Sequence, residues 1–253
     1  MSLLPPLSLH LSIALGATSQ LPYPLAYDEI GSYLFGSTLP DVHIISRATR
    51  RSTHFSDLNQ EPAEDGIAQF KQNYPELSSN ASSDKTTRAL VAGYFSHLIT
   101  DKMWIQDIYR PIFGAGSALA ADPLSNIMDR ALQYELDKRV RDNHPLISHL
   151  SSLLSQVPLK SGFAFLDSNY IQQWHEFVMT AMAREPSWSN FPNYARRYLL
   201  PYGKVSQAEM DTFLADLPHK LEWILHHVTE ERLAAFIQKA TDLSVKAAGE
   251  YLN

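Results

Sequence analysis

A histidine and an aspartate lie one helical turn apart in the most apolar stretch of the chain. His97 and Asp101 fall within residues 84–109, DKTTRALVAGYFSHLITDKMWIQDIY, of which residues 89–99 are almost continuously apolar. Residues four apart share one face of a helix, with Cβ atoms about 5–6 Å apart, so both side chains can reach one metal ion. A buried histidine bonded to a carboxylate is also a common structural pair. The pair alone leaves both interpretations open.

Three residues earlier in the chain offer the same kinds of ligand atom. His10 lies in an apolar first helix, Asp41 follows Pro40, which restricts the local backbone, and His54 ends a basic segment. Taken singly, these residues are equally typical of a core histidine, a turn or cap residue and a surface histidine. Since the chain has no cysteine, any metal must be held by His, Asp or Glu, and this set suits zinc or a similar divalent ion.

Residues around Asp41 give weaker signals. His43 is expected to orient a ligand rather than to bind metal itself. Arg47, Arg50 and Arg51 could attract a substrate phosphate, because a guanidinium can donate two parallel hydrogen bonds to it, and Arg47 and Arg51 are retained as candidates for binding it. A cluster of charges in a loop is more often simply solvated.

The order of these motifs resembles the zinc-dependent phospholipase C family, which is related by fold to the P1-type zinc nucleases. The resemblance covers about residues 8–140. The motifs that carry it are His10, the run GSTLPD ending at Asp41, THF around His54, and GYFSHLITD with His97 and Asp101, followed by Trp104.

The resemblance implies an all-helical fold with a cleft that holds two zinc ions, or three. It implies that Asp41, His54, His97 and Asp101 surround one ion, and that Asp101 bridges to a second ion bound by His10. The activity implied is metal-assisted hydrolysis of a phosphodiester or phospholipid-like substrate, with Asp41 also acting as the catalytic base that orients water.

The sequence departs from the family where further histidine ligands are expected, because no histidine lies between Asp101 and Asn143. Asp129 and Glu135 are the acidic residues there. Asp129 is retained as a weaker metal-ligand candidate, with a solvated helix face as the alternative. The departure keeps a second function open: a non-catalytic helical scaffold or partner-binding module with a structural or vestigial metal site.

Apolar residues recur at i, i+3, i+4 spacing while period-2 alternation is scarce, which predicts an all-α fold, a multi-helix phospholipase C/P1 nuclease-like bundle. We expect one domain over residues 1–253, with the metal motifs in 8–140 and a C-terminal helical half from about 160 that the resemblance does not place. Helices are expected over 6–17, 23–36, 62–73, 84–110, 123–141, 145–156, 168–184, 190–199, 206–227 and 230–251.

Composition narrows the function classes. The net charge of −6 and pI near 5.9 disfavour a protein that binds nucleic acid by general electrostatics, so nuclease action on single strands gains little support. No apolar stretch reaches the ~18 residues of a transmembrane segment. The apolar N-terminus lacks the basic region of a clear signal peptide, which predicts a cytoplasmic protein. The sequence carries no signal for an oligomeric state.

Overall fold

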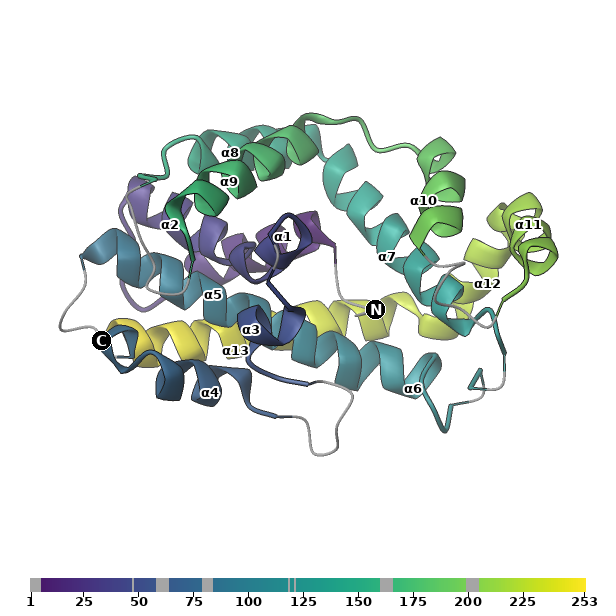
Figure 1. Ribbon diagram of the computed structural model, residues 1–253, viewed down its shortest axis with the longest axis horizontal. Coiled ribbons are helices and arrows are strands. Elements are labelled where there is room, and N and C mark those ends of the chain that lie inside the picture. Colours follow the sequence, from purple (N-terminus) through teal and green to yellow (C-terminus); the bar gives the residue numbers. More distant parts are fainter. Residues whose placement is uncertain are drawn as a thin grey trace.

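The fold is built from helices, as the apolar spacing predicts. A computed structural model of the protein describes residues 6–46, 48–57, 64–78, 84–117, 119–120, 122–159, 166–198 and 205–253. These described residues contain no β-strand, so the all-α prediction is confirmed (Figure 1). The finer prediction, a phospholipase C/P1 nuclease-like bundle, stays a prediction.

Short 3₁₀ and π segments link the helices. The elements in chain order are α1 (Leu7–Thr18), α2 (Tyr27–Gly36), the 3₁₀ helix η1 (Leu39–Ile44), α3 (Arg50–His54), α4 (Gly66–Asn73), the 3₁₀ turn η2 (Pro75–Leu77), α5 (Lys85–Met103), the π-helical η3 (Trp104–Tyr109), α6 (Arg110–Ile112), α7 (Ser125–Asp142), α8 (His144–Leu154), α9 (Ser168–Ala183), the 3₁₀ turn η4 (Trp188–Asn190), α10 (Phe191–Tyr198), α11 (Gln207–Ala215), α12 (Leu217–Val228) and α13 (Glu230–Leu252).

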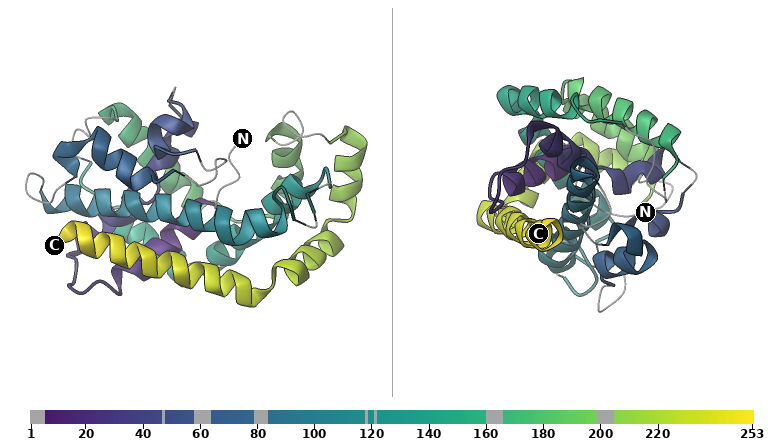
Figure 2. Two further views of the ribbon diagram at one scale, coloured as in Figure 1. Left: turned by 90° about the horizontal axis from the view of Figure 1, so that it is seen from below. Right: turned by 90° about the vertical axis from the view of Figure 1, so that its left-hand side faces the viewer.

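Helix α5 is the centre of the molecule. It packs against α2 on one side and runs alongside the long C-terminal helix α13 on another, as Figures 1 and 2 show. Its residues from Ala89 to Asp101 are all buried, which explains why this stretch is apolar almost all round.

Two apolar clusters form the core, and together they place the C-terminal half of the chain. The first gathers around α2 and the middle of α5, and α8 and α9 cover it. The second gathers around the end of α5, η3 and α7, and includes residues of α10 to α13. The helices after residue 166 therefore complete both clusters.

Two glycines allow α2 and α5 to touch backbone to backbone. A Cβ atom on Gly93 would lie 1.9 Å from the carbonyl oxygen of Tyr33, and one on Gly36 would lie 2.0 Å from that of Leu90. No other residue fits at either position without moving a helix. The close crossing brings the chain that follows α2, which includes Ser37 and η1, onto the face of α5 that carries His97.

Side chains cap several of the helices. Asp84 caps α5 by accepting from two backbone N–H groups, Asp167 caps α9, and Ser206 forms a capping box with Glu209 at the start of α11. Thr229 caps α13.

The structure corrects two local expectations. The single helix expected over 206–227 is two helices, α11 and α12, separated at Asp216, because Pro218 in the first turn of α12 has no N–H to continue a helix. The segment expected to be irregular after Gly36 contains η1 and α3.

Among the described residues, no helix combines the length and the apolar character needed to cross a membrane.

The glycine contact can be tested by substitution. We expect Gly93→Ala to lower the free energy of unfolding by about 2 kcal/mol or more, because the new methyl group overlaps the backbone of α2. Gly249→Ala in α13 is the matched control. Its Cβ meets nothing within 4 Å, so the higher helix propensity of alanine should leave stability unchanged or raise it. Urea unfolding measures both; equal values for the two variants would contradict the close crossing.

Candidate metal centre

Five predicted ligands meet at one place in the core. His10 comes from α1, Asp41 from η1, His54 from the end of α3, and His97 and Asp101 from α5. Four of them are buried, and Asp41 has 16% of its side chain exposed. They form two overlapping groups whose ligand atoms lie close enough to hold a metal ion: His10, Asp41 and His97; and His54, His97 and Asp101.

Three ligand atoms form a nearly equilateral triangle. The Nε2 atoms of His54 and His97 are 3.2 Å apart, and Asp101 Oδ2 lies 3.4 Å from the first and 3.5 Å from the second. A tetrahedral zinc ion with bonds near 2.0–2.1 Å requires its ligands to be about 3.3–3.4 Å apart. The triangle therefore has the dimensions of one face of such a tetrahedron. Asp41 Oδ1 lies 3.6 Å from His54 Nε2 and 4.0 Å from His97 Nε2.

A backbone carbonyl fixes the tautomer of His97, and one also lies beside His54. His97 Nδ1 lies 2.8 Å from the carbonyl oxygen of Ser37, and His54 Nδ1 lies 3.2 Å from that of Arg50. A carbonyl accepts only, so His97 Nδ1 carries a proton, and in the neutral ring its Nε2 carries a lone pair. His54 Nδ1 also lies 3.0 Å from the Thr53 hydroxyl, which can donate as well as accept, so either tautomer of His54 has a partner. The His97 lone pair and a carboxylate oxygen thus face His54 Nε2, and a cation, either a proton on His54 Nε2 or a metal ion, would stabilise the arrangement.

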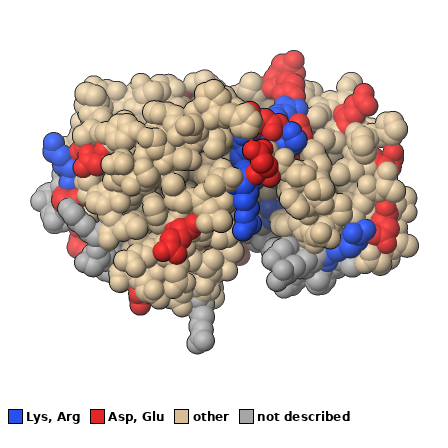
Figure 3. All heavy atoms as spheres, turned by 90° about the horizontal axis from the view of Figure 1, so that it is seen from above, with Lys and Arg blue, Asp and Glu red and all other residues tan. Residues whose placement is uncertain are grey.

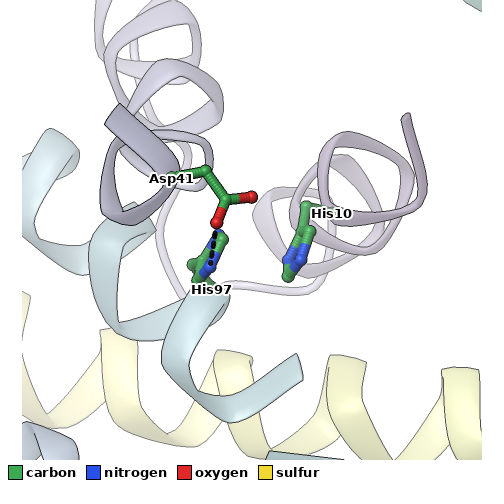
Figure 4. A group of neighbouring side chains, drawn as sticks. All are labelled: His10, Asp41 and His97. Atoms are coloured by element: carbon green, nitrogen blue, oxygen red, sulfur yellow. Dashed lines mark ion pairs between the residues drawn. The ribbon is translucent and has the colours of Figure 1, made fainter. Parts of the chain in front are cut away.

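His10 extends the cluster on the other side of His97. Their rings stack with centroids 3.9 Å apart and planes at 5°, and Figure 4 shows Asp41 above the pair with an oxygen directed at His97. His10 Nε2 is 3.4 Å from Asp101 Oδ1. Within the described structure, neither ring nitrogen of His10 nor this oxygen makes a hydrogen bond. Buried polar atoms left without a bond are costly, and a bound ion would satisfy them.

The surroundings of Asp41, Asp101 and His10 shift the pKa of each group. Burial by itself raises the pKa of Asp101, but His97, with His10 and His54 also beside the carboxylate, holds it well below its usual range. Burial also raises the pKa of Asp41, but the nearby His97 and His54 outweigh this effect, so the pKa of Asp41 is lowered. Burial lowers the pKa of His10. At neutral pH the carboxylates are ionised and His10 is neutral, so these buried groups could bind a metal ion.

The short helix α3 is held in a defined conformation around His54. Thr49 caps it by accepting from the backbone N–H of Ser52, and the carbonyl of Thr53 accepts a hydrogen bond from the buried Tyr94 hydroxyl. Phe55, directly after His54, has φ 56°, a left-handed conformation that ends the helix. The ligand is thus fixed from both ends of a five-residue helix.

The arginine at the cluster is Arg50, which was not retained among the phosphate-binding candidates. Arg47 lies outside the described residues. Arg51 has 64% of its side chain exposed and pairs with Glu64 at 3.1 Å, so it does not contact the cluster. Arg50 donates from Nη2 to Asp101 Oδ2 at 2.9 Å. Arg50 lies four residues before His54, and residues with this spacing share one face of a helix, so the spacing could have identified Arg50.

His43 and Asp129 lie outside the triangle. His43 Nδ1 bonds to the carbonyl of Pro40. The His43 ring lies edge-on to the His54 ring, with ring centroids 5.4 Å apart, which suits the expected role of orienting a ligand. Asp129 belongs to neither metal-competent group. Its oxygens accept from Trp104 Nε1 at 3.1 Å and from Gln133 Nε2 at 2.7 Å.

The cluster opens onto a cleft of about 730 Å³, within the range typical of ligand sites. Asp41, His43 and Arg50 lie at its metal-cluster end. The polar residues of α7 form one wall, and the other wall is the largely apolar face of α9, with Trp174 and Phe177. On the surface seen in Figure 3, charged side chains of both signs gather in a band between two mostly uncharged regions.

Comparisons with known proteins give no family assignment. No protein-family model, no curated protein and no solved structure matches the chain. The resemblance to the zinc-dependent phospholipases C therefore rests on the motifs and their order.

Metal binding should stabilise the fold. Zinc at about 100 times its dissociation constant should raise the thermal unfolding midpoint by roughly 5–10 °C, because it binds the folded chain only. The variant His97→Ala removes a ligand shared by both groups and should abolish the rise. His149→Ala, an exposed histidine of α8, should retain it. A rise of the same size in both variants would place the ion elsewhere.

Asp129 should make stability depend on pH. Burial raises its pKa to about 7, against Arg130 and the bonds from Trp104 and Gln133. Because the folded pKa exceeds the unfolded one, the folded state binds the proton more tightly, and the stability this provides is lost as pH rises towards 7. From about pH 5 to about pH 7 the parent should lose about 2 kcal/mol relative to Asp129→Asn, measured by urea unfolding. Asp142→Asn, an exposed carboxylate on the same helix, should show no such change relative to the parent.

Proposed function

We propose that the protein is a zinc-dependent hydrolase of phosphodiester bonds. The observation that carries the proposal is the triangle of ligand atoms from His54, His97 and Asp101, set in the core beside a cleft. A structural histidine–aspartate pair needs one imidazole, whereas here two imidazole Nε2 atoms 3.2 Å apart share one carboxylate oxygen.

Two zinc ions fit the donor atoms better than three. The triangle with Asp41 supplies donors for the first, and His10 with Asp101 Oδ1 supplies donors for a second. Nitrogen and carboxylate donors at tetrahedral spacing favour zinc. In the part of the chain that the structure describes, there is no further group of three His, Asp or Glu for a third ion.

The residues at the cleft end of the cluster have the chemistry for hydrolysis. Bound zinc would acidify water and stabilise negative charge on phosphate oxygens. Asp41 is ionised, partly exposed and lines the cleft, so it can orient the attacking water and accept its proton. Arg50 also lines the cleft, and its guanidinium can donate to a phosphate oxygen while Nη2 holds Asp101.

The cleft suits a phosphodiester with an apolar substituent. Trp174 and Phe177 stack with ring centroids 4.9 Å apart and, with Ala181 and Met182, form an apolar wall. Ile44, at the end of η1, is 61% exposed and extends the apolar surface at the mouth. A phospholipid-like substrate would place its phosphate at the cluster and its apolar part along α9.

Activity on a chromogenic phosphodiester tests the proposal. Zinc-loaded protein should hydrolyse bis(4-nitrophenyl) phosphate, and Asp41→Asn should lower kcat by at least about 100-fold, because the amide cannot accept a proton. Asp28→Asn, an exposed carboxylate of α2, should leave kcat unchanged.

The same assay decides against the alternative of a non-catalytic module. If Asp41→Asn and the parent show the same residual rate while elemental analysis finds zinc in both, the cluster holds a structural ion. If gently purified protein contains no transition metal before or after zinc addition, the proposal is wrong.

A further inference from the structure

One oxygen of Asp101 has two kinds of partner. Asp101 Oδ2 is the carboxylate corner of the ligand triangle, 3.4 Å from His54 Nε2 and 3.5 Å from His97 Nε2. The same buried oxygen accepts from Arg50 Nη2 at 2.9 Å. An arginine stays protonated at any pH the protein meets. The guanidinium therefore places a permanent positive charge beside an oxygen atom that a metal ion would use.

The pair of Arg50 and Asp101 is joined through a single contact. Within the described residues, neither Arg50 Nε nor Asp101 Oδ1 makes a hydrogen bond, so the two side chains do not form the bidentate arrangement with two parallel bonds. The Arg50 side chain is 20% exposed and lines the cleft. The guanidinium can therefore turn towards the cleft by giving up one bond.

The backbone of Arg50 contributes to the cluster separately from its side chain. Arg50 begins the five-residue helix α3, and its carbonyl oxygen lies 3.2 Å from His54 Nδ1. This contact belongs to the main chain, so a substitution of the side chain keeps it. The charge of Arg50 can thus be removed while the backbone beside His54 stays the same.

Two effects of the Arg50 side chain on metal binding oppose each other. Its bond helps to hold the Asp101 carboxylate in place, which favours metal binding. Its charge repels a second cation at the same oxygen, and repulsion between buried charges is little screened by salt. The carboxylate is also confined by the buried helix α5 that carries it and by His10, whose Nε2 lies 3.4 Å from Oδ1. The repulsion is therefore the larger effect.

We propose that Arg50 is the counter-ion of the metal-free cluster and lowers its affinity for zinc. Without metal, the guanidinium compensates the buried charge of Asp101, which would be costly alone. With metal bound, the carboxylate has another cationic partner, and more of the guanidinium donors are available to a phosphate in the cleft. The role in phosphate binding rests on the proposed function, whereas the effect on affinity rests only on metal binding by the cluster.

The zinc affinity of the full chain tests this role without any catalysis. In competition with a chelator of known affinity, Arg50→Gln should bind zinc roughly tenfold or more tightly than the parent, the scale on which neighbours of metal ligands act. Arg51→Gln is the matched control, because Arg51 is the next residue of α3 and pairs with Glu64 instead of the cluster. It should bind zinc as the parent does. An affinity of Arg50→Gln equal to or weaker than that of the parent overturns the proposal.

A charge-conserving variant separates the charge from the other properties of the side chain. Arg50→Lys keeps the positive charge without the planar fork, so its zinc affinity should lie closer to that of the parent than to that of Arg50→Gln. If Arg50→Lys binds zinc as tightly as Arg50→Gln, the charge is not the cause and the proposal is wrong.

The rate of zinc release covers a loss of folding in the metal-free variant. Removing Arg50 leaves Asp101 with one partner fewer, and circular dichroism in the presence of chelator shows whether Arg50→Gln is still folded. If it is not, zinc-loaded protein is mixed with excess chelator, and Arg50→Gln should release zinc more slowly than the parent. An equal or faster release then contradicts the proposal.

Hydrolysis tests the part that rests on the proposed function. With saturating zinc, Arg50→Gln should raise KM for bis(4-nitrophenyl) phosphate roughly tenfold. Arg139→Gln is the control, since Arg139 bonds Glu135 and Glu230 and is not part of the cleft lining. An unchanged KM in Arg50→Gln overturns the role in phosphate binding. If the parent hydrolyses nothing, the proposed function fails while the zinc titration still decides the effect of Arg50; if the parent binds no zinc, both fail.

Discussion

The buried carboxylate of Asp101 is the interaction on which the candidate site depends. Its two oxygens lie within 3.5 Å of nitrogen atoms from His10, His54, His97 and Arg50, which come from three helices, α1, α3 and α5. A charge with no exposure would destabilise the fold if it stood alone. The three helices converge so that each supplies a partner, and the same convergence produces the ligand triangle.

Backbone packing makes that convergence possible. The contact of α2 and α5 at Gly36 and Gly93 brings Ser37 close enough for its carbonyl to accept from His97 Nδ1 at 2.8 Å. That bond turns the Nε2 lone pair towards Asp101. A methyl group that forced α2 and α5 apart would therefore disturb the bond that orients His97, although His97 itself is unchanged.

Much of the helical framework could be predicted from the sequence, because apolar periodicity and capping residues such as Asp84 act locally. The pairing of His97 with Asp101 was also accessible, since i, i+4 spacing on a helix fixes proximity. Arg50 was not retained as a candidate, and the alternative of a solvated helix face for Asp129 is wrong, because this side chain is buried. Whether Arg50 or Arg51 faces the cluster depends on the rotation of the five-residue α3, and the partners of Asp129 come from η3 and α7. These are tertiary contacts that no local spacing encodes.

The net charge at the metal-cluster end of the cleft depends on whether a metal ion is bound. With neutral histidines, the carboxylates Asp41 and Asp101 and the guanidinium of Arg50 sum to one negative charge. A single divalent cation reverses that sign, so the end of the cleft becomes positive only when metal is bound. Without Arg50 the same cation would merely neutralise the site. With one ion bound, Arg50 therefore makes the difference between a neutral and a positive site, whereas the two ions of the proposed hydrolase would make the site positive with or without Arg50.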